Sequence, residues 1–204
     1  MTFPSGNEIV AFLRRYLVAA LLFSFALTLA ADSQDGPKDA VILIIRHGEK
    51  PAAGPYLAPE GEQRAEAYVR YFQDFTVDSE RLTPNAVFAA QDSNASQRPR
   101  LTVEPFAKAA GLQVDARFPS DHSDKFAAAL RRTEQGKRIL ICWHHGDVPN
   151  LLQALGAKPE DVLPNGKWPD SVYGWVLLLR YDRHGHLIPG SARRIEEHLM
   201  PDDS

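Results

Sequence analysis

Two short apolar runs, each followed directly by histidines, constrain the fold of this chain more than any other feature. The runs cover residues 40–45 and 138–143, and both are rich in β-branched and other large apolar side chains. Apolar runs of four to eight residues without alternation are typical of strands that are buried on both faces of a parallel sheet. The sequence therefore predicts an α/β protein with these two runs as central strands.

Helical patterns lie between the apolar runs. They predict helices over 59–72, 101–110, 123–134 and 149–155, with further strands over 86–89 and 173–181 and an edge hairpin near Gly185. Strands that alternate with helices predict a three-layer α/β sandwich, in which helices flank a mostly parallel central sheet. One such domain is expected over residues 40–204, after a polar linker over 32–39. The pairs Arg193-Arg194 and Glu196-Glu197 are expected to lie in a solvated tail.

Residues 1–31 have the three parts of a secretory signal peptide. Arg14 and Arg15 precede an apolar run that ends in the small residues Ala30 and Ala31. The run is shorter than the roughly 20 residues that a membrane-spanning helix needs. Export, most simply to the periplasm, is therefore expected, and an uncleaved N-terminal anchor is the alternative. Contact with a membrane is expected only through this segment.

The net charge argues against one class of partner, and the cysteine content argues against two roles for cysteine. The formal net charge of −3 argues against a nucleic-acid-binding protein, which normally has a basic excess or stripe. Cys142 is the only cysteine, and it stands within the second apolar run. It therefore forms no intramolecular disulfide and is expected to be a small buried side chain rather than a nucleophile.

Histidines and arginines gather at the expected carboxyl ends of the strands. Arg46-His47-Gly48 and His144-His145 follow the two apolar runs, and Arg98 and Arg100 follow the strand expected over 86–89. Ligands bind at this edge of open α/β sheets. Guanidinium groups fit phosphate oxygens, and a neutral imidazole can attack phosphorus, so these residues predict a phosphoryl-transfer site that requires no metal and no cofactor. Nearby arginine charges would keep His47 neutral.

The same segments resemble, in the same order, the motifs of the histidine phosphatase superfamily. This is the phosphoglycerate-mutase-like group, which has an RHG signature, and the resemblance is to its small-phosphatase branch. The similar segments are Arg46-His47-Gly48, Leu57 to Ala65, Arg98 to Pro105, and Ile141 to His144 with Val148-Pro149 after it. The resemblance implies a phosphoglycerate-mutase-like fold and a phosphohistidine intermediate on His47. It also implies that Arg46, Arg98 and His144 bind the phosphoryl group, which favours Arg98 over Arg100 as the pocket arginine.

The proton donor that many of these proteins carry before the second histidine has no clear counterpart in this chain. Asp121, Asp147 and Glu49 are the candidates for a general acid, although Asp121 is more typical of a solvated loop carboxylate or a helix cap. His145 stands where similar proteins often have a small residue, and it is expected in the pocket wall. A metal site through His144 and His145 is an alternative, but adjacent strand residues point to opposite faces.

These features favour an exported phosphatase that hydrolyses phosphomonoesters, or phosphohistidine, through His47. Its substrate would be a small molecule or a phosphoprotein, with no nucleic-acid partner. A non-catalytic phosphate sensor of the same fold and a phosphomutase are the alternatives. Export favours hydrolysis, because a mutase depends on a primed phosphohistidine that is hard to sustain outside the cytoplasm.

Overall fold

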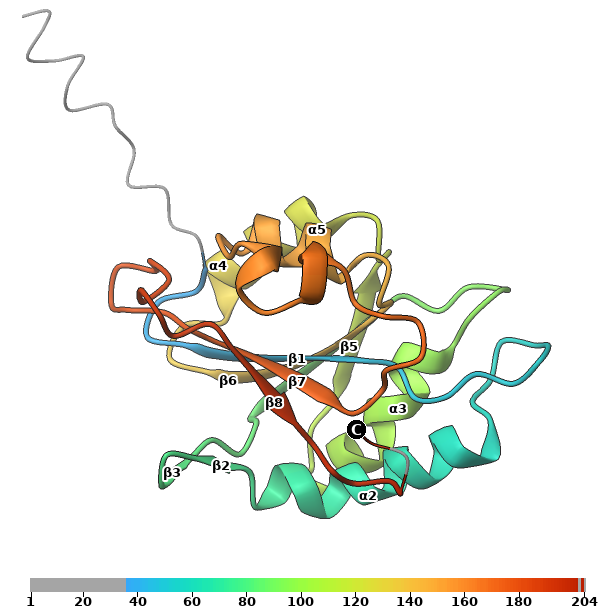
Figure 1. Ribbon diagram of the computed structural model, residues 1–204. Helices are drawn as coiled ribbons and strands as arrows, with labels where there is room; N and C mark the ends of the chain where they lie inside the picture. Colours follow the sequence, from blue (N-terminus) through green and yellow to red (C-terminus); the bar gives the residue numbers. More distant parts are fainter. Residues whose placement is uncertain (1–35, 202, 204) are drawn as a thin grey trace, which may run out of the picture. The chain divides into compact units, whose positions relative to one another are not determined.

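A six-stranded sheet forms the centre of the computed structural model, which describes residues 36–201 and 203 (Figure 1). The strand order is β5-β4-β6-β1-β7-β8. The strands are β1 (Val41–Arg46), β4 (Ala86–Ala90), β5 (Val114–Phe118), β6 (Arg138–Trp143), β7 (Trp175–Arg180) and β8 (Arg193–Glu196). Strands β5, β4, β6 and β1 are parallel, and β7 and β8 run antiparallel to their neighbours.

The two apolar runs pair with each other as β1 and β6, in the middle of the sheet. Their register is parallel, and it places Arg46 opposite Trp143 at the last pair. The two strands therefore end level, and His47 and His144 leave the sheet side by side. This register is what brings the two histidine clusters of the sequence to one edge.

Helices cover both faces of the sheet (Figure 1). Helices α2 (Pro59–Gln73) and α3 (Arg98–Ala109) lie on one face, where Phe72 and Phe106 pack against alternate side chains of β1 such as Leu43. Helices α4 (Ser123–Thr133) and α5 (Val148–Ala154) lie on the other face, with Phe126 and Leu151 in its core. Short elements complete the fold: β2 (Thr76–Val77), β3 (Glu80–Arg81), η1 (Pro159–Asp161) and η2 (Pro164–Gly166). The predicted three-layer α/β fold with a mostly parallel sheet is confirmed.

Three elements differ from the expectation. Strand β5 was not predicted, although Val114, Ala116 and Phe118 alternate with Asp115 and Arg117, because this edge strand has only five residues. Helix α3 begins at Arg98 rather than at residue 101, because Pro99 suits the first helical turn. The expectation that Arg193-Arg194 and Glu196-Glu197 lie in a solvated tail was wrong. Residues 193–196 form β8, an edge strand whose polar side chains are mostly exposed, and Glu197 is buried.

The first described residues are hydrogen-bonded to the turn that follows β7. In the predicted linker, the backbone N–H of Gly36 donates to Gly185 O at 2.9 Å, and that of Asp39 donates to Asp182 O at 2.8 Å. The predicted signal peptide, 1–31, and the first part of the linker lie outside the described residues. Within 36–201, no helix combines the length and the apolar character that crossing a bilayer requires.

Candidate active site

His47 opens the loop after β1 and is only 3% exposed. Its Nδ1 lies 2.7 Å from the carbonyl oxygen of Gly48, so Nδ1 carries the proton and donates it to that oxygen. Burial lowers the pKa of His47 to about 3, and the charges of Arg46, His144 and Arg98 act in the same direction, although the bond to Gly48 opposes them. The ring is therefore neutral near pH 7, and Nε2 keeps a lone pair that can act as a nucleophile.

The loop after His47 is held by close backbone contacts to α2 and α3. The N–H of Gly48 donates to Thr102 Oγ1 at 2.8 Å, and that hydroxyl donates to Arg98 O at 2.8 Å. A Cβ atom on Gly61 would lie 2.6 Å from Glu49 O, and one on Gly48 would lie 3.0 Å from Gly61 O. Glycine at both positions therefore lets the start of α2 touch the loop directly.

Arg46 is the last residue of β1, and its side chain is completely buried. Its Nη1 donates to three carbonyl oxygens, of Pro169 at 3.2 Å, Asp170 at 3.0 Å and Val172 at 2.7 Å. The guanidinium carbon lies 3.9 Å from the centre of the Tyr173 ring, a cation–π contact. Burial lowers the pKa of Arg46, and its Nε–H is buried with no partner among the described residues. The guanidinium group is therefore fixed in place with one donor left unsatisfied.

His144 and Arg98 complete the group that surrounds His47. The ring centres of His47 and His144 lie 5.3 Å apart in an edge-to-face arrangement. Burial lowers the pKa of His144, and the charge of Arg98 is the next largest cause. The Nη1 of Arg98 donates to Gly54 O at 3.0 Å, and its buried Nε–H also has no partner among the described residues. Buried donors without acceptors are costly, and a bound anion would satisfy them.

Arg100, the alternative to Arg98, points toward carboxylates instead of the histidines. Its Nε lies 2.8 Å from Asp92 Oδ2, and its Nη1 lies 2.9 Å from Glu104 Oε2. Both acceptors are partly exposed, so this is a surface ion-pair network. The structure therefore brings Arg98, and not Arg100, to the histidines.

The three candidate proton donors lie in different surroundings. Glu49 is held by Arg64, whose Nη2 lies 2.7 Å from Glu49 Oε1. Asp147 accepts a hydrogen bond from Ser120 Oγ at 2.6 Å, and its charge acts on His144, whose pKa it raises against the effect of burial. Asp121 is exposed and lines a surface hollow beside α5. Of the three, Asp147 is the carboxylate whose charge acts on a histidine of the site.

His145 supports Arg46. Its Nδ1 accepts a hydrogen bond from Arg46 Nη2 at 3.3 Å, and its Nε2–H donates to Asp170 Oδ1 at 2.7 Å. Both ring nitrogens are therefore engaged, which leaves neither for shared ligation of a metal with His144. Across residues 36–201 and 203, no three His, Cys, Asp or Glu side chains form a group that could hold a metal ion.

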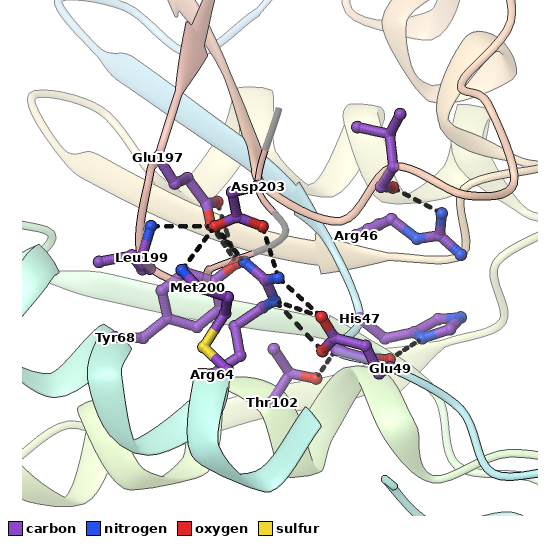
Figure 2. Close-up of polar contacts among 12 residues, drawn as sticks. Arg46, His47, Glu49, Arg64, Tyr68, Thr102, Glu197, Leu199, Met200 and Asp203 are labelled. Carbon is purple, nitrogen blue, oxygen red and sulfur yellow. Dashed lines mark hydrogen bonds and ion pairs between the residues drawn. The ribbon is translucent and has the colours of Figure 1, made fainter. Parts of the chain in front are cut away.

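A second cluster of charged residues beside the site was not found from the sequence. Arg64 is only 2% exposed, and Figure 2 shows that Glu49, Glu197 and Asp203 all point toward it. Its position four residues before the buried Tyr68 in α2 was a usable signal, since residues four apart share a helix face. Glu197 and Asp203 carried no such signal, because they come from the segment expected to be a solvated tail.

Several solved structures are similar to the structure of this chain. A phosphoserine phosphatase from Entamoeba histolytica, in complex with 3-phosphoglyceric acid, has a TM-score of 0.54 and 15% sequence identity, covering 79% of this chain and 100% of that one. A phosphoglycerate mutase from Bacillus anthracis has a TM-score of 0.47 and 12% identity, covering 77% and 94%. A mycobacterial glucosyl-3-phosphoglycerate phosphatase with inorganic phosphate has a TM-score of 0.46 and 15% identity, covering 76% and 94%.

Sequence comparison adds no relative: no protein-family model matches this chain, and no curated protein is similar to it in sequence. The resemblance read from the sequence motifs is nevertheless confirmed at the level of the fold. The chain has the fold of that phosphoserine phosphatase, a phosphoglycerate-mutase-like α/β sandwich.

Proposed function

We propose that this protein is an exported phosphatase, which hydrolyses phosphomonoesters or phosphohistidine through a covalent phosphohistidine on His47. The observation that carries the proposal is the pairing of a neutral imidazole with two arginines. Among the described residues, Nε2 of that imidazole has no hydrogen-bond partner, and each arginine has a buried Nε–H without an acceptor. A phosphoryl group supplies both a target for Nε2 and acceptors for the arginines.

In the first step, the Nε2 lone pair of His47 attacks phosphorus, and the bond from phosphorus to the leaving oxygen breaks. The ring then carries a positive charge, which the Gly48 carbonyl stabilises through Nδ1–H. Arg46, Arg98 and His144 stabilise the charge on the equatorial oxygens. The leaving oxygen takes a proton from a carboxylic acid, for which Asp147 is the candidate because it lies close enough to His144 to act on it electrostatically.

In the second step, water attacks the phosphorus atom of phosphohistidine. The bond from phosphorus to nitrogen breaks, and its electron pair returns to Nε2. One proton of the attacking water passes to the carboxylate that protonated the leaving oxygen, and inorganic phosphate leaves. An acidic leaving group, or one that is itself a phosphohistidine, would need less help from a proton donor. Export is supported by the signal-peptide pattern of residues 1–31.

Hydrolysis of p-nitrophenyl phosphate by the purified protein tests the proposal. His47→Ala should lower kcat by about 10⁴-fold or more, because the covalent path is lost. His122→Ala changes an exposed histidine at the start of α4 and serves as the matched control. Labelled phosphohistidine should be trapped at alkaline pH in the wild type and be absent from His47→Ala.

Two results would contradict the proposal. Equal rates for the wild type and His47→Ala would exclude His47 as the nucleophile. Binding of inorganic phosphate without turnover of any member of a broad phosphoester panel would favour the alternative of a phosphate sensor.

A further inference from the structure

The last described residue of the chain takes part in the charged cluster around Arg64 (Figure 2). Asp203 binds the guanidinium group with both oxygens: Oδ1 lies 2.7 Å from Nη2, and Oδ2 lies 3.0 Å from Nη1. The backbone N–H groups of Leu199 and Met200 each donate to Asp203 Oδ2 at 2.9 Å. The tail is therefore folded so that its carboxylate faces Arg64.

The adjacent edge of the same guanidinium group, which includes Nη2, holds the loop that carries the nucleophile. Arg64 Nε lies 3.1 Å from Glu49 Oε1 and 3.2 Å from Oε2, and Nη2 lies 2.7 Å from Oε1. Glu49 follows Gly48 directly, so its nitrogen and the Gly48 carbonyl belong to one planar peptide unit. That carbonyl oxygen is the acceptor for His47 Nδ1–H. An interaction that restrains the position of Glu49 therefore also restrains the Gly48 carbonyl and the orientation of the His47 imidazole.

A cavity of about 620 Å³ borders the cluster, and Glu49, Arg64, Tyr173 and Asp203 all line it. The Glu49 side chain is 20% exposed, so it depends on Arg64 for a unique position, whereas Arg64 is only 2% exposed. Asp203 also lies against Gly174, where a Cβ atom would be 2.5 Å from Asp203 Cγ, so the tail itself is closely seated.

We infer that Asp203 is a positioning residue for catalysis, which holds the His47 imidazole in its reactive orientation through Arg64, Glu49 and the Gly48 carbonyl. The inference rests on the proposed phosphatase function, since it assigns a role within that reaction. The path ends at the nucleophile and includes neither Arg98 nor His144. Loss of Asp203 should therefore lower kcat much more than it raises KM.

Asp203→Asn is the first test, because it removes the charge and keeps the shape. Arg64 retains the carboxylate of Glu49, so the substitution does not leave a buried cation without an anion. We expect kcat for p-nitrophenyl phosphate to fall about tenfold, since small misplacements of reacting groups have effects of this size or larger. KM and the affinity for orthovanadate should stay within about twofold of wild type on the same principle.

Glu196→Gln is the matched control. Glu196 is an exposed carboxylate in the same part of the chain, lines the same cavity and bonds to no atom of Arg64. Its kcat should equal that of the wild type. A kcat loss in Glu196→Gln equal to that in Asp203→Asn would overturn the inference, because loss of any local charge would then suffice. Wild-type kcat in Asp203→Asn, with or without a lower Tm, would also overturn it.

Asp203→Ala provides a second variant and a rescue. Formate can place a carboxylate on Arg64 where Asp203 is missing, so sodium formate should raise kcat of this variant toward wild type, while sodium chloride at equal ionic strength should not. A kcat that formate leaves unchanged would contradict the inference.

The NMR signal of the His47 ring separates failure of this inference from failure of the proposed function. In the wild type the Nδ1–H proton should exchange slowly with water, and in Asp203→Asn it should exchange faster. This comparison needs no turnover, so it remains decisive if the wild type hydrolyses no substrate. Equal exchange rates would show that Asp203 does not position the imidazole.

Discussion

The Nδ1 atom of His47 donates its proton to the carbonyl oxygen of Gly48 at 2.7 Å, and this contact decides which nitrogen of the ring can react. It directs the Nε2 lone pair away from the backbone, and it stabilises the positive ring that phosphoryl transfer would create. The acceptor belongs to a loop that α2 touches through Gly61 and that Arg64 holds through Glu49.

We predict that His47 remains neutral at pH 5. Burial and neighbouring positive charges lower its pKa to about 3, so the folded protein binds fewer protons there than the unfolded chain between pH 3 and about 6.5. The contribution of His47 to stability is therefore complete above pH 6.5 and is lost as the pH falls toward 3. Nitrogen-15 NMR should show one protonated and one bare ring nitrogen at pH 5, with His47→Gln used to assign the signals. Two protonated nitrogens at pH 5 would contradict the prediction.

We predict that Gly61→Ala destabilises the protein and lowers its activity. The new Cβ atom would lie 2.6 Å from Glu49 O and 2.8 Å from Glu49 N, so either α2 or the His47 loop must move. Overpacking of this kind costs about 1–3 kcal/mol. Gly146→Ala is the control for thermal unfolding, because its Cβ atom would have no neighbour within 4 Å. Equal melting temperatures for the two variants would disprove the close contact.

The central part of this site follows from the sequence for a simple physical reason. Uniformly apolar strands can only be buried, and the carboxyl ends of parallel neighbours meet at one edge, so Arg46, His47 and His144 had to converge. Edge strands give a weaker signal. Strand β5 alternates apolar and charged residues over only five positions, and β8 has charged residues at three of its four positions, as loops often do.

The Arg64 cluster could not be predicted, because its members are brought together only by tertiary structure. Glu197 and Asp203 lie more than 130 residues from Arg64 in sequence, as the separations of 133 and 139 show. Both residues stand in a polar part of the sequence, where a carboxylate is more often exposed to solvent than buried. Sequence patterns report which faces are apolar, and they contain no information on which distant charges will pair.

We predict that Glu197→Gln becomes more stabilising as the pH rises. Glu197 is fully surrounded by protein, and burial raises its pKa to about 8, although Arg64 and Tyr68 oppose the shift. The folded protein therefore binds more protons at this site than the unfolded chain between about pH 4.5 and 8, and the wild type loses this stability as the pH rises through that window. Glutamine has no proton to lose. The difference in unfolding free energy between variant and wild type should grow by at most about 1.4 kcal/mol per pH unit.

Thermal unfolding at pH 5 and pH 8 checks this prediction. The exposed neighbour Glu196→Gln is the control for loss of a carboxylate in the same segment. A Glu197→Gln effect that is equal at pH 5 and pH 8 would show that the Glu197 carboxyl group is already ionised in the folded protein at pH 5.

We predict that Arg98→Ala lowers kcat strongly and that Arg100→Ala does not, although the two residues are separated by only one position. Arg98 has a buried Nε–H without a partner, and its charge lowers the pKa of both His47 and His144. Its loss removes a donor for developing phosphoryl charge, which costs about 10²–10³-fold in kcat.

Arg100 binds only partly exposed acceptors, such as Asp92 and Glu104, and pairs of this kind contribute about 0–1 kcal/mol to stability. Arg100→Ala should therefore lower Tm slightly and leave kcat and orthovanadate affinity at wild-type values. An inactive Arg100→Ala beside an active Arg98→Ala would mean that the phosphate lies on the other side of the first turn of α3, where His47 could not reach it.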